Sequence, residues 1–151
     1  MKKSKKQIFI FNQFFYPAFK AGGPIKSLKL IKEQLNKKFD TVIFTSSYDI
    51  DETKIFKLKK KKSINNFNIF FYLILFLFKN FFLKKVKAPL YFNSFFNYKY
   101  TIFPLIFFKL FTKKNKIIVA PRGELFNSEI KKKFIKKKIY MLLFTLFLKK
   151  K

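Results

Sequence analysis

The sequence predicts an α/β protein built on a Rossmann-like parallel sheet flanked by helices. Residues 7–11 form a short, unbroken apolar run, which is typical of a strand buried on both faces, and residues 41–45 form a second such run. The segment between them carries apolar residues at helical spacing: Ile25, Leu28, Ile31 and Leu35. A strand, a helix and a strand in this order form a βαβ unit, in which the two strands lie parallel.

The later part of the chain continues the alternation of strands and helices. Further strands are expected at 89–94 and 116–120, with a weak edge strand at 54–58. A helix is expected at 102–111, where Pro104 suits the first turn because it has no amide hydrogen to offer.

Two apolar segments raise the question of a membrane. Residues 67–83 are the most hydrophobic, but they are short for a span and are expected to form a buried or interfacial helix. The tail, 129–151, is expected to form one helix with a basic first half and an apolar second half. Because lysines near an anionic surface favour binding, we expect a cytoplasmic protein, peripheral at the inner face of the cell membrane.

The composition excludes several kinds of chemistry. The 151 residues suit one domain, 1–151, with a formal net charge of +28. Cys and His are absent, so thiolate or imidazole metal sites and a Ser-His-Asp triad are excluded. Asp49, Asp51 and Glu52 are interpreted as a solvated loop rather than a metal cluster. We therefore expect no metal and no cofactor.

Glycine and arginine are rare and mark two candidate binding segments. Gly22 and Gly23 follow the first strand and precede a helix, where unpaired amides could receive an anion. Arg122, the only arginine, stands beside Gly123 directly after the strand at 116–120. A planar guanidinium grips phosphate or carboxylate with two bonds, which lysine cannot do. An ordinary turn and a surface charge remain the alternatives.

These segments resemble the amino-terminal domain of family-4 glycosyltransferases, which have a two-domain, GT-B-type fold. The resemblance covers nearly the whole chain in order, and it is carried by three stretches: Tyr16-Pro17 with Gly22-Gly23-Pro24, then Asn93-Ser94-Phe95-Phe96, then Ala120-Pro121-Arg122-Gly123-Glu124-Leu125 with its basic helix.

The resemblance implies retaining transfer of a sugar from a nucleotide-sugar to a glycan or lipid-linked acceptor, as in polysaccharide biosynthesis. By analogy, Gly22 and Gly23 would lie near the donor's phosphates, and Arg122 with Gly123 would face the same cleft. Many members carry a histidine near the position of Asn93, whose amide could instead bond a sugar hydroxyl.

The resemblance also implies an incomplete, amino-terminal half of the GT-B fold. The family's second domain holds most of the donor and carries a characteristic pair of glutamates, which is not reproduced by Glu33, Glu52, Glu124 and Glu129. We expect the chain to be inactive alone, with the donor domain either lost or carried by a separate chain.

Two other classes of protein remain as alternatives. A basic nucleic-acid-binding protein would explain the charge, and its aromatic residues could stack on bases. This is disfavoured because the aromatic residues fall within apolar runs, where core packing is the ordinary use. A small membrane-associated protein would explain the segments at 67–83 and 139–148.

Overall fold

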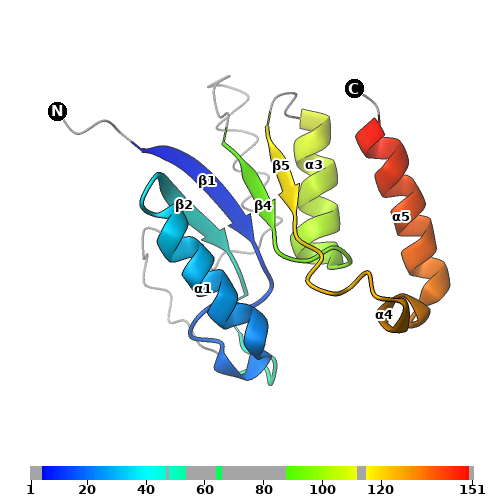
Figure 1. The fold of residues 1–151 in the computed structure, drawn as a ribbon, viewed down its shortest axis with the longest axis horizontal. Coiled ribbons are helices and arrows are strands. Elements are labelled where there is room, and N and C mark those ends of the chain that lie inside the picture. Colours follow the sequence, from blue (N-terminus) through cyan, green and yellow to red (C-terminus); the bar gives the residue numbers. More distant parts are fainter. Residues whose placement is uncertain (1–4, 47, 54–63, 66–87, 112–114, 150–151) are drawn as a thin grey trace.

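The chain folds around a parallel sheet of five strands. The computed structural model describes residues 5–46, 48–53, 64–65, 88–111 and 115–149. The strands lie in the order β3-β2-β1-β4-β5, and every neighbouring pair is parallel (Figure 1). The predicted fold class, a Rossmann-like parallel sheet flanked by helices, is confirmed.

The strands are short and mostly apolar: β1 (Lys6–Phe11), β2 (Phe39–Phe44), β3 (Ile64–Asn65), β4 (Leu90–Phe92) and β5 (Ile117–Val119). Four of them coincide with predicted runs and differ only at their ends. β3, which pairs with β2, was not predicted. The predicted edge strand at 54–58 and the predicted helix at 67–83 lie outside the described residues.

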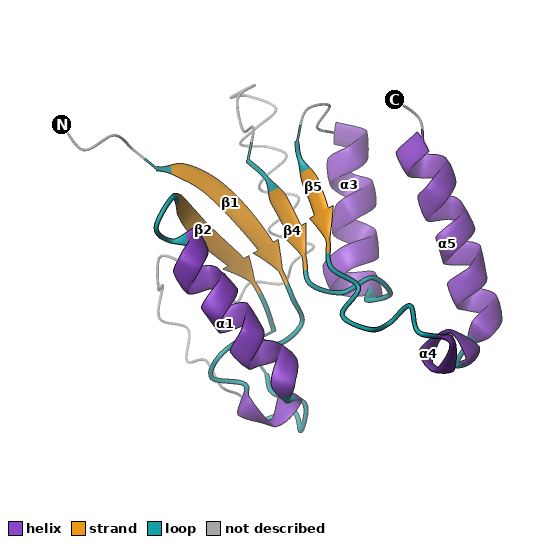
Figure 2. Cartoon of the chain, in the orientation of Figure 1, coloured by secondary structure: helices purple, strands orange, loops and turns teal. Residues whose placement is uncertain are grey.

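Two helices cover opposite faces of the sheet (Figure 2). Along β1, Phe9 and Phe11 belong to one buried cluster, while Ile10 belongs to the other. The first cluster includes side chains of α3 (Phe103–Phe111), and the second includes Leu28 of α1 (Gly23–Leu35). Because successive side chains of a strand point to opposite faces, the unbroken apolar run of β1 is explained by a helix on each side.

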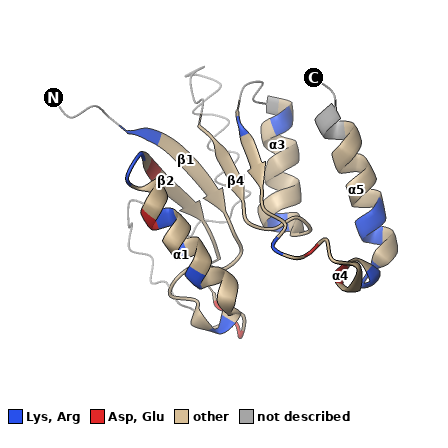
Figure 3. Ribbon diagram, viewed as in Figure 1, with Lys and Arg blue, Asp and Glu red and all other residues tan. Residues whose placement is uncertain are grey.

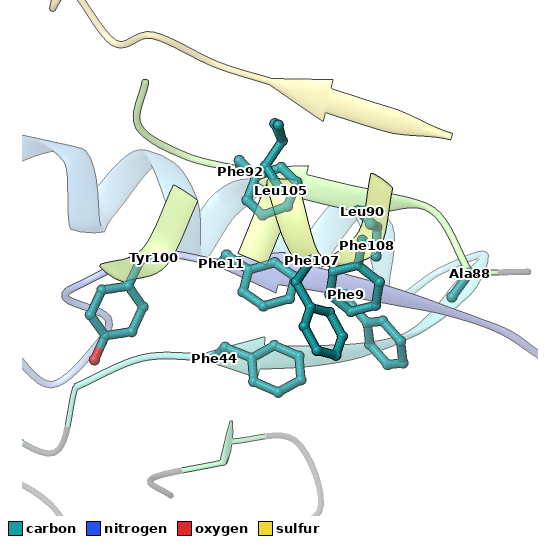
Figure 4. Close-up of a cluster of buried hydrophobic side chains, with 10 residues drawn as sticks. All are labelled: Phe9, Phe11, Phe44, Ala88, Leu90, Phe92, Tyr100, Leu105, Phe107 and Phe108. Carbon is teal, nitrogen blue, oxygen red and sulfur yellow. The ribbon is translucent and has the colours of Figure 1, made fainter. Parts of the chain in front are cut away.

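Aromatic rings fill the core beneath α3 (Figure 4). Phe11 is stacked on Phe44 and on Phe92, with centroid separations of 4.5 Å and 4.9 Å. Phe108 of α3 meets Phe11 edge-on at 5.9 Å. Such pairs stabilise a core beyond their buried area. Since these rings are buried, they are not free to stack on the bases of a nucleic acid.

The tail is not one helix, and that prediction is wrong. It consists of α4 (Asn127–Lys131) and α5 (Phe134–Lys149). Between them Lys132 is extended, and Lys133 has a positive φ of 57°, so the helical hydrogen-bond ladder is interrupted. The break turns α5 along the outside of the molecule, beyond α3 (Figure 1), where Phe144 packs against the core cluster beneath α3.

Two loops differ from their predictions. Asp49 is buried, and its carboxylate accepts the Lys20 and Ile50 amides at 3.1 Å and 2.7 Å, so the solvated-loop prediction is wrong there. The bond to the Lys20 amide fixes the short 3-10 turn η1 (Phe19–Ala21), which precedes α1. A short π-helical turn, η2 (Tyr98–Ile102), extends the amino-terminal side of α3 and was not predicted.

Candidate anion-binding site at the carboxyl edge of the sheet

The site lies where the order in which strands are added to the sheet reverses, between β1 and β4. From β1 the chain passes to β2 and β3 on one side, and it returns to β4 and β5 on the other side of β1. In sheets of this kind the loops after the two central strands diverge, and ligands bind outside their carboxyl ends. The first residues after β1 and β4 are Asn12 and Asn93, and the Asn93 Nδ2 donates to Asn12 Oδ1 at 3.3 Å. Two buried amides therefore mark the switch point.

Asn93 is the centre of a polar network. Its Oδ1 accepts a hydrogen bond from Arg122 Nε at 2.7 Å and another from the Tyr91 hydroxyl at 3.4 Å. Arg122 Nη2 also donates to the Tyr91 hydroxyl, at 3.3 Å. With its bond to Asn12, the Asn93 side chain holds three partners while only 3% exposed. It is placed to orient Arg122, and it retains one amide hydrogen for a further bond.

The Arg122 guanidinium is anchored on one edge and open on the other. Nε and Nη2 form the edge that holds Asn93 and Tyr91. The edge formed by Nη1 and the second Nη2 hydrogen remains for a bidentate partner. Arg122 is exposed and takes part in neither of the two ion pairs found among the described residues. The positive charge is therefore positioned but not neutralised.

A tight turn presents this arginine. Pro121 O accepts the Glu124 amide at 3.0 Å, and both central residues, Arg122 and Gly123, have positive φ, at 52° and 83°. A Cβ at Gly123 would also lie 3.3 Å from the Phe126 ring. Gly123 is therefore required by the turn itself, and it acts on the site by shaping the backbone that carries Arg122.

Glu124 ties the turn to the loop that follows β4. Its carboxylate accepts the Ser94 hydroxyl at 2.8 Å, the Phe96 amide at 3.1 Å and the Phe95 amide. Its charge also reaches Tyr140 on α5: burial first, and then the nearby Glu124 carboxylate, raise the pKa of Tyr140 to about 12. Glu124 thus holds the β4 and β5 loops together, which keeps Arg122 beside Asn93.

The glycine pair lies at the start of α1, apart from this network. Gly22 has a positive φ of 83° and its carbonyl accepts the Ile25 amide at 3.3 Å, while Pro24 has no amide hydrogen. A Cβ at Gly23 would meet nothing within 4 Å. The structure thus joins Asn93, Arg122 and Gly123, whereas in the described residues no hydrogen bond connects this group to Gly22 or Gly23.

Three members of the site were not predicted from sequence. Asn12 could have been found, because a polar residue directly after a buried strand is a useful signal at the edge of a parallel sheet. Tyr91 and Glu124 carry no such signal, since the hydrogen bonds that tie Tyr91 to Arg122 and Glu124 to Ser94 join segments distant in the sequence.

Comparison with known proteins does not assign the chain to a family. No protein-family model matches it, and neither the curated proteins nor the solved structures contain a significant match. Within the described residues, no group of acidic, histidine or cysteine side chains could hold a metal ion. In the same part of the chain, no helix has both the length and the apolar character that crossing a bilayer requires.

Proposed function

We propose that this chain is the amino-terminal domain of a GT-B-type glycosyltransferase similar to family 4, acting in sugar transfer from a nucleotide-sugar to a glycan or lipid-linked acceptor. The observation that carries the proposal is the linked set Asn12, Asn93 and Arg122 at the switch point of the sheet. It combines a free cationic edge with amides, which suits a ligand that has both phosphate and hydroxyl groups.

The chemistry of Arg122 favours a phosphate. A guanidinium with one open edge binds a phosphate through two parallel hydrogen bonds, and its charge persists at every physiological pH. The bonds to Asn93 and Tyr91 hold the side chain before a ligand arrives, so less rotamer entropy is lost on binding. The sequence resemblance supports a nucleotide-sugar as the source of that phosphate.

A GT-B-type site lies between two domains, so the proposal includes a donor-binding domain facing this edge of the sheet. That domain would belong to the same protein or to a separate partner chain. Gly23, with open space in place of a Cβ, would allow a ligand group to approach the start of α1 closely.

Nuclear magnetic resonance offers a direct test, because the only arginine gives an isolated Nε–H signal. We expect millimolar nucleotide-sugars to shift this signal and the side-chain amides of Asn12 and Asn93. Inorganic phosphate should move the arginine signal alone. Titrations at about 0.15 M salt reduce diffuse binding to the many lysines, because the screening length is then about 8 Å.

The matched variant is Arg122→Lys, which keeps the charge but removes the fork. A lost hydrogen bond to a charged group costs about 1.5–3 kcal/mol, so nucleotide-sugar affinity should fall by roughly tenfold or more. Equal affinities for the two forms would make Arg122 an ordinary surface charge and would remove the basis of the proposal.

A further inference from the structure

The ring contacts that attach helix α5 to other described parts of the protein come from one side of the helix. Lys137 lies over the Phe96 ring at 4.8 Å, while Tyr140 and Phe144 pack against Phe95 with centroid separations of 5.1 Å and 4.7 Å. These three positions follow each other at helical spacing and therefore share one side of α5. This packed side accounts for the docking of α5 on the β4 loop.

The opposite side of α5 is an exposed apolar stripe. The stripe consists of Ile135, Ile139, Leu142 and Leu146, with exposed fractions of 73%, 54%, 62% and 58%. The intervals of four, three and four residues align them along one line of the helix. Single exposed apolar side chains are ordinary on a protein surface. A continuous stripe of them indicates a surface that binds another molecule or a membrane.

Positive charge borders the stripe. At about 100° per residue, Lys136 falls on one flank and Lys138 on the other, and both are exposed. Lys131 ends α4, and the break that follows carries Lys132 and Lys133; the sequence contains no acidic residue after Glu129. Figure 3 shows this basic segment at the base of α5, followed by uncharged residues along the helix.

We propose that α5 lies flat on an anionic lipid surface, with the exposed stripe among the acyl chains and the flanking lysines at the headgroups. A helix with an exposed apolar side and lysines bordering its first turns suits this interfacial position. Its sixteen residues span about 24 Å, which is less than the bilayer core of about 30 Å, so α5 lies along the surface.

The charge of the protein favours an anionic membrane, rather than a second copy of the chain, as the partner that covers the stripe. Pairing two stripes would bring together two copies of a protein whose formal net charge is +28, and the two copies would repel each other. An anionic membrane instead attracts each lysine. The inference is independent of sugar transfer, since the residues of the stripe are not part of the network around Asn93.

Co-sedimentation with vesicles tests the inference. The full chain should bind vesicles that contain phosphatidylglycerol and should bind pure phosphatidylcholine weakly. The double substitution Lys136→Gln and Lys138→Gln should weaken binding to the anionic vesicles by roughly fivefold per lysine. High salt should release the protein, as expected for peripheral binding. Equal binding to both kinds of vesicle would overturn the electrostatic part of the inference.

A matched pair of variants isolates the stripe. Leu142 and Leu30 are exposed to nearly the same extent, 62% and 61%, but Leu30 lies on α1. Leu142→Gln should reduce vesicle binding about tenfold, and Leu30→Gln should leave it unchanged. Circular dichroism checks that both variants fold. Equal effects of the two substitutions would overturn the assignment of the stripe. Failure of the full chain to bind the anionic vesicles would also overturn the inference. If the chain instead formed a dimer that Leu142→Gln dissociates, the stripe would be an interface between copies. If it instead bound an oligonucleotide, the basic segment would serve a nucleic acid.

Discussion

Gly22, which caps α1, and Gly23, which is its first residue, differ in whether the backbone conformation requires glycine. Gly22 has φ 83° and ψ −156°, a backbone region that essentially only glycine adopts, so Gly22→Ala should destabilise the protein by about 1–3 kcal/mol. Gly23 has open space where a Cβ would lie, and it stands within the helix. Gly23→Ala should therefore leave stability unchanged or raise it by up to about 1 kcal/mol. Urea denaturation of the two variants measures both effects.

The same pair of variants separates a structural glycine from a binding one. If a phosphate approaches the backbone at Gly23, the added methyl group of Gly23→Ala should weaken nucleotide-sugar binding although the fold is intact. Unchanged binding would show that the glycine pair only starts the helix, which is the ordinary-turn alternative.

At the residue scale, the sequence identified the unusual residues but not their partners. Arg122 and Asn93 could be chosen in advance because one is the only arginine and the other follows a predicted strand. That they share a hydrogen bond depends on β4 pairing with β5, and that Asn12 joins them depends on β4 pairing with β1. Such pairings between distant segments have no local pattern.

The break between α4 and α5 gives a prediction at the element scale. Lys133 has a positive φ, which glycine adopts without strain. In Lys133→Gly, this relief should offset the greater chain entropy of glycine, so stability should stay within about 0.5 kcal/mol of the parent. Lys136 is exposed within α5, and there the same substitution should cost about 0.5–1 kcal/mol.

Thermal unfolding of these two variants decides whether the tail is broken in solution. Equal costs at the two positions would mean that the helix continues through Lys133, and the packing of Tyr140 and Phe144 on Phe95 would have to be reconsidered.

Sequence patterns could not predict this break, because the lysines that form it are good helix formers and no glycine or proline interrupts them. The break is stabilised by tertiary contacts, above all the rings that dock α5 on the β4 loop. Four of the strands, β1, β2, β4 and β5, and helix α1 were predictable for the opposite reason, since their apolar patterns and their places in the fold agree.

At the scale of the whole molecule, the alternation of strands and helices predicted a parallel sheet, and the structure confirms it. The position of β4 beside β1 could not be inferred, because alternation alone leaves the strand order open. That position creates the switch point, and it brings Asn12 and Asn93 within hydrogen-bonding distance.

The composition of the site leads to the last prediction. The Glu124 carboxylate is occupied by three donors from the β4 loop. The sequence contains no histidine or cysteine, and Glu124 is the one acidic residue bonded within the network around Asn93 and Arg122 in the described part of the chain. The chain alone should therefore bind nucleotide-sugars weakly and transfer no sugar, because the reacting groups would come from the donor domain.

A screen of nucleotide-sugar donors tests this directly, with the release of nucleoside diphosphate as the measured signal. We expect release by the purified chain to equal the background. Turnover by the lone chain that Arg122→Lys abolishes would contradict the prediction, since a contaminating transferase would be indifferent to that substitution. Such a result would mean that the reacting groups lie within these 151 residues, outside the edge formed by Asn12, Asn93 and Arg122.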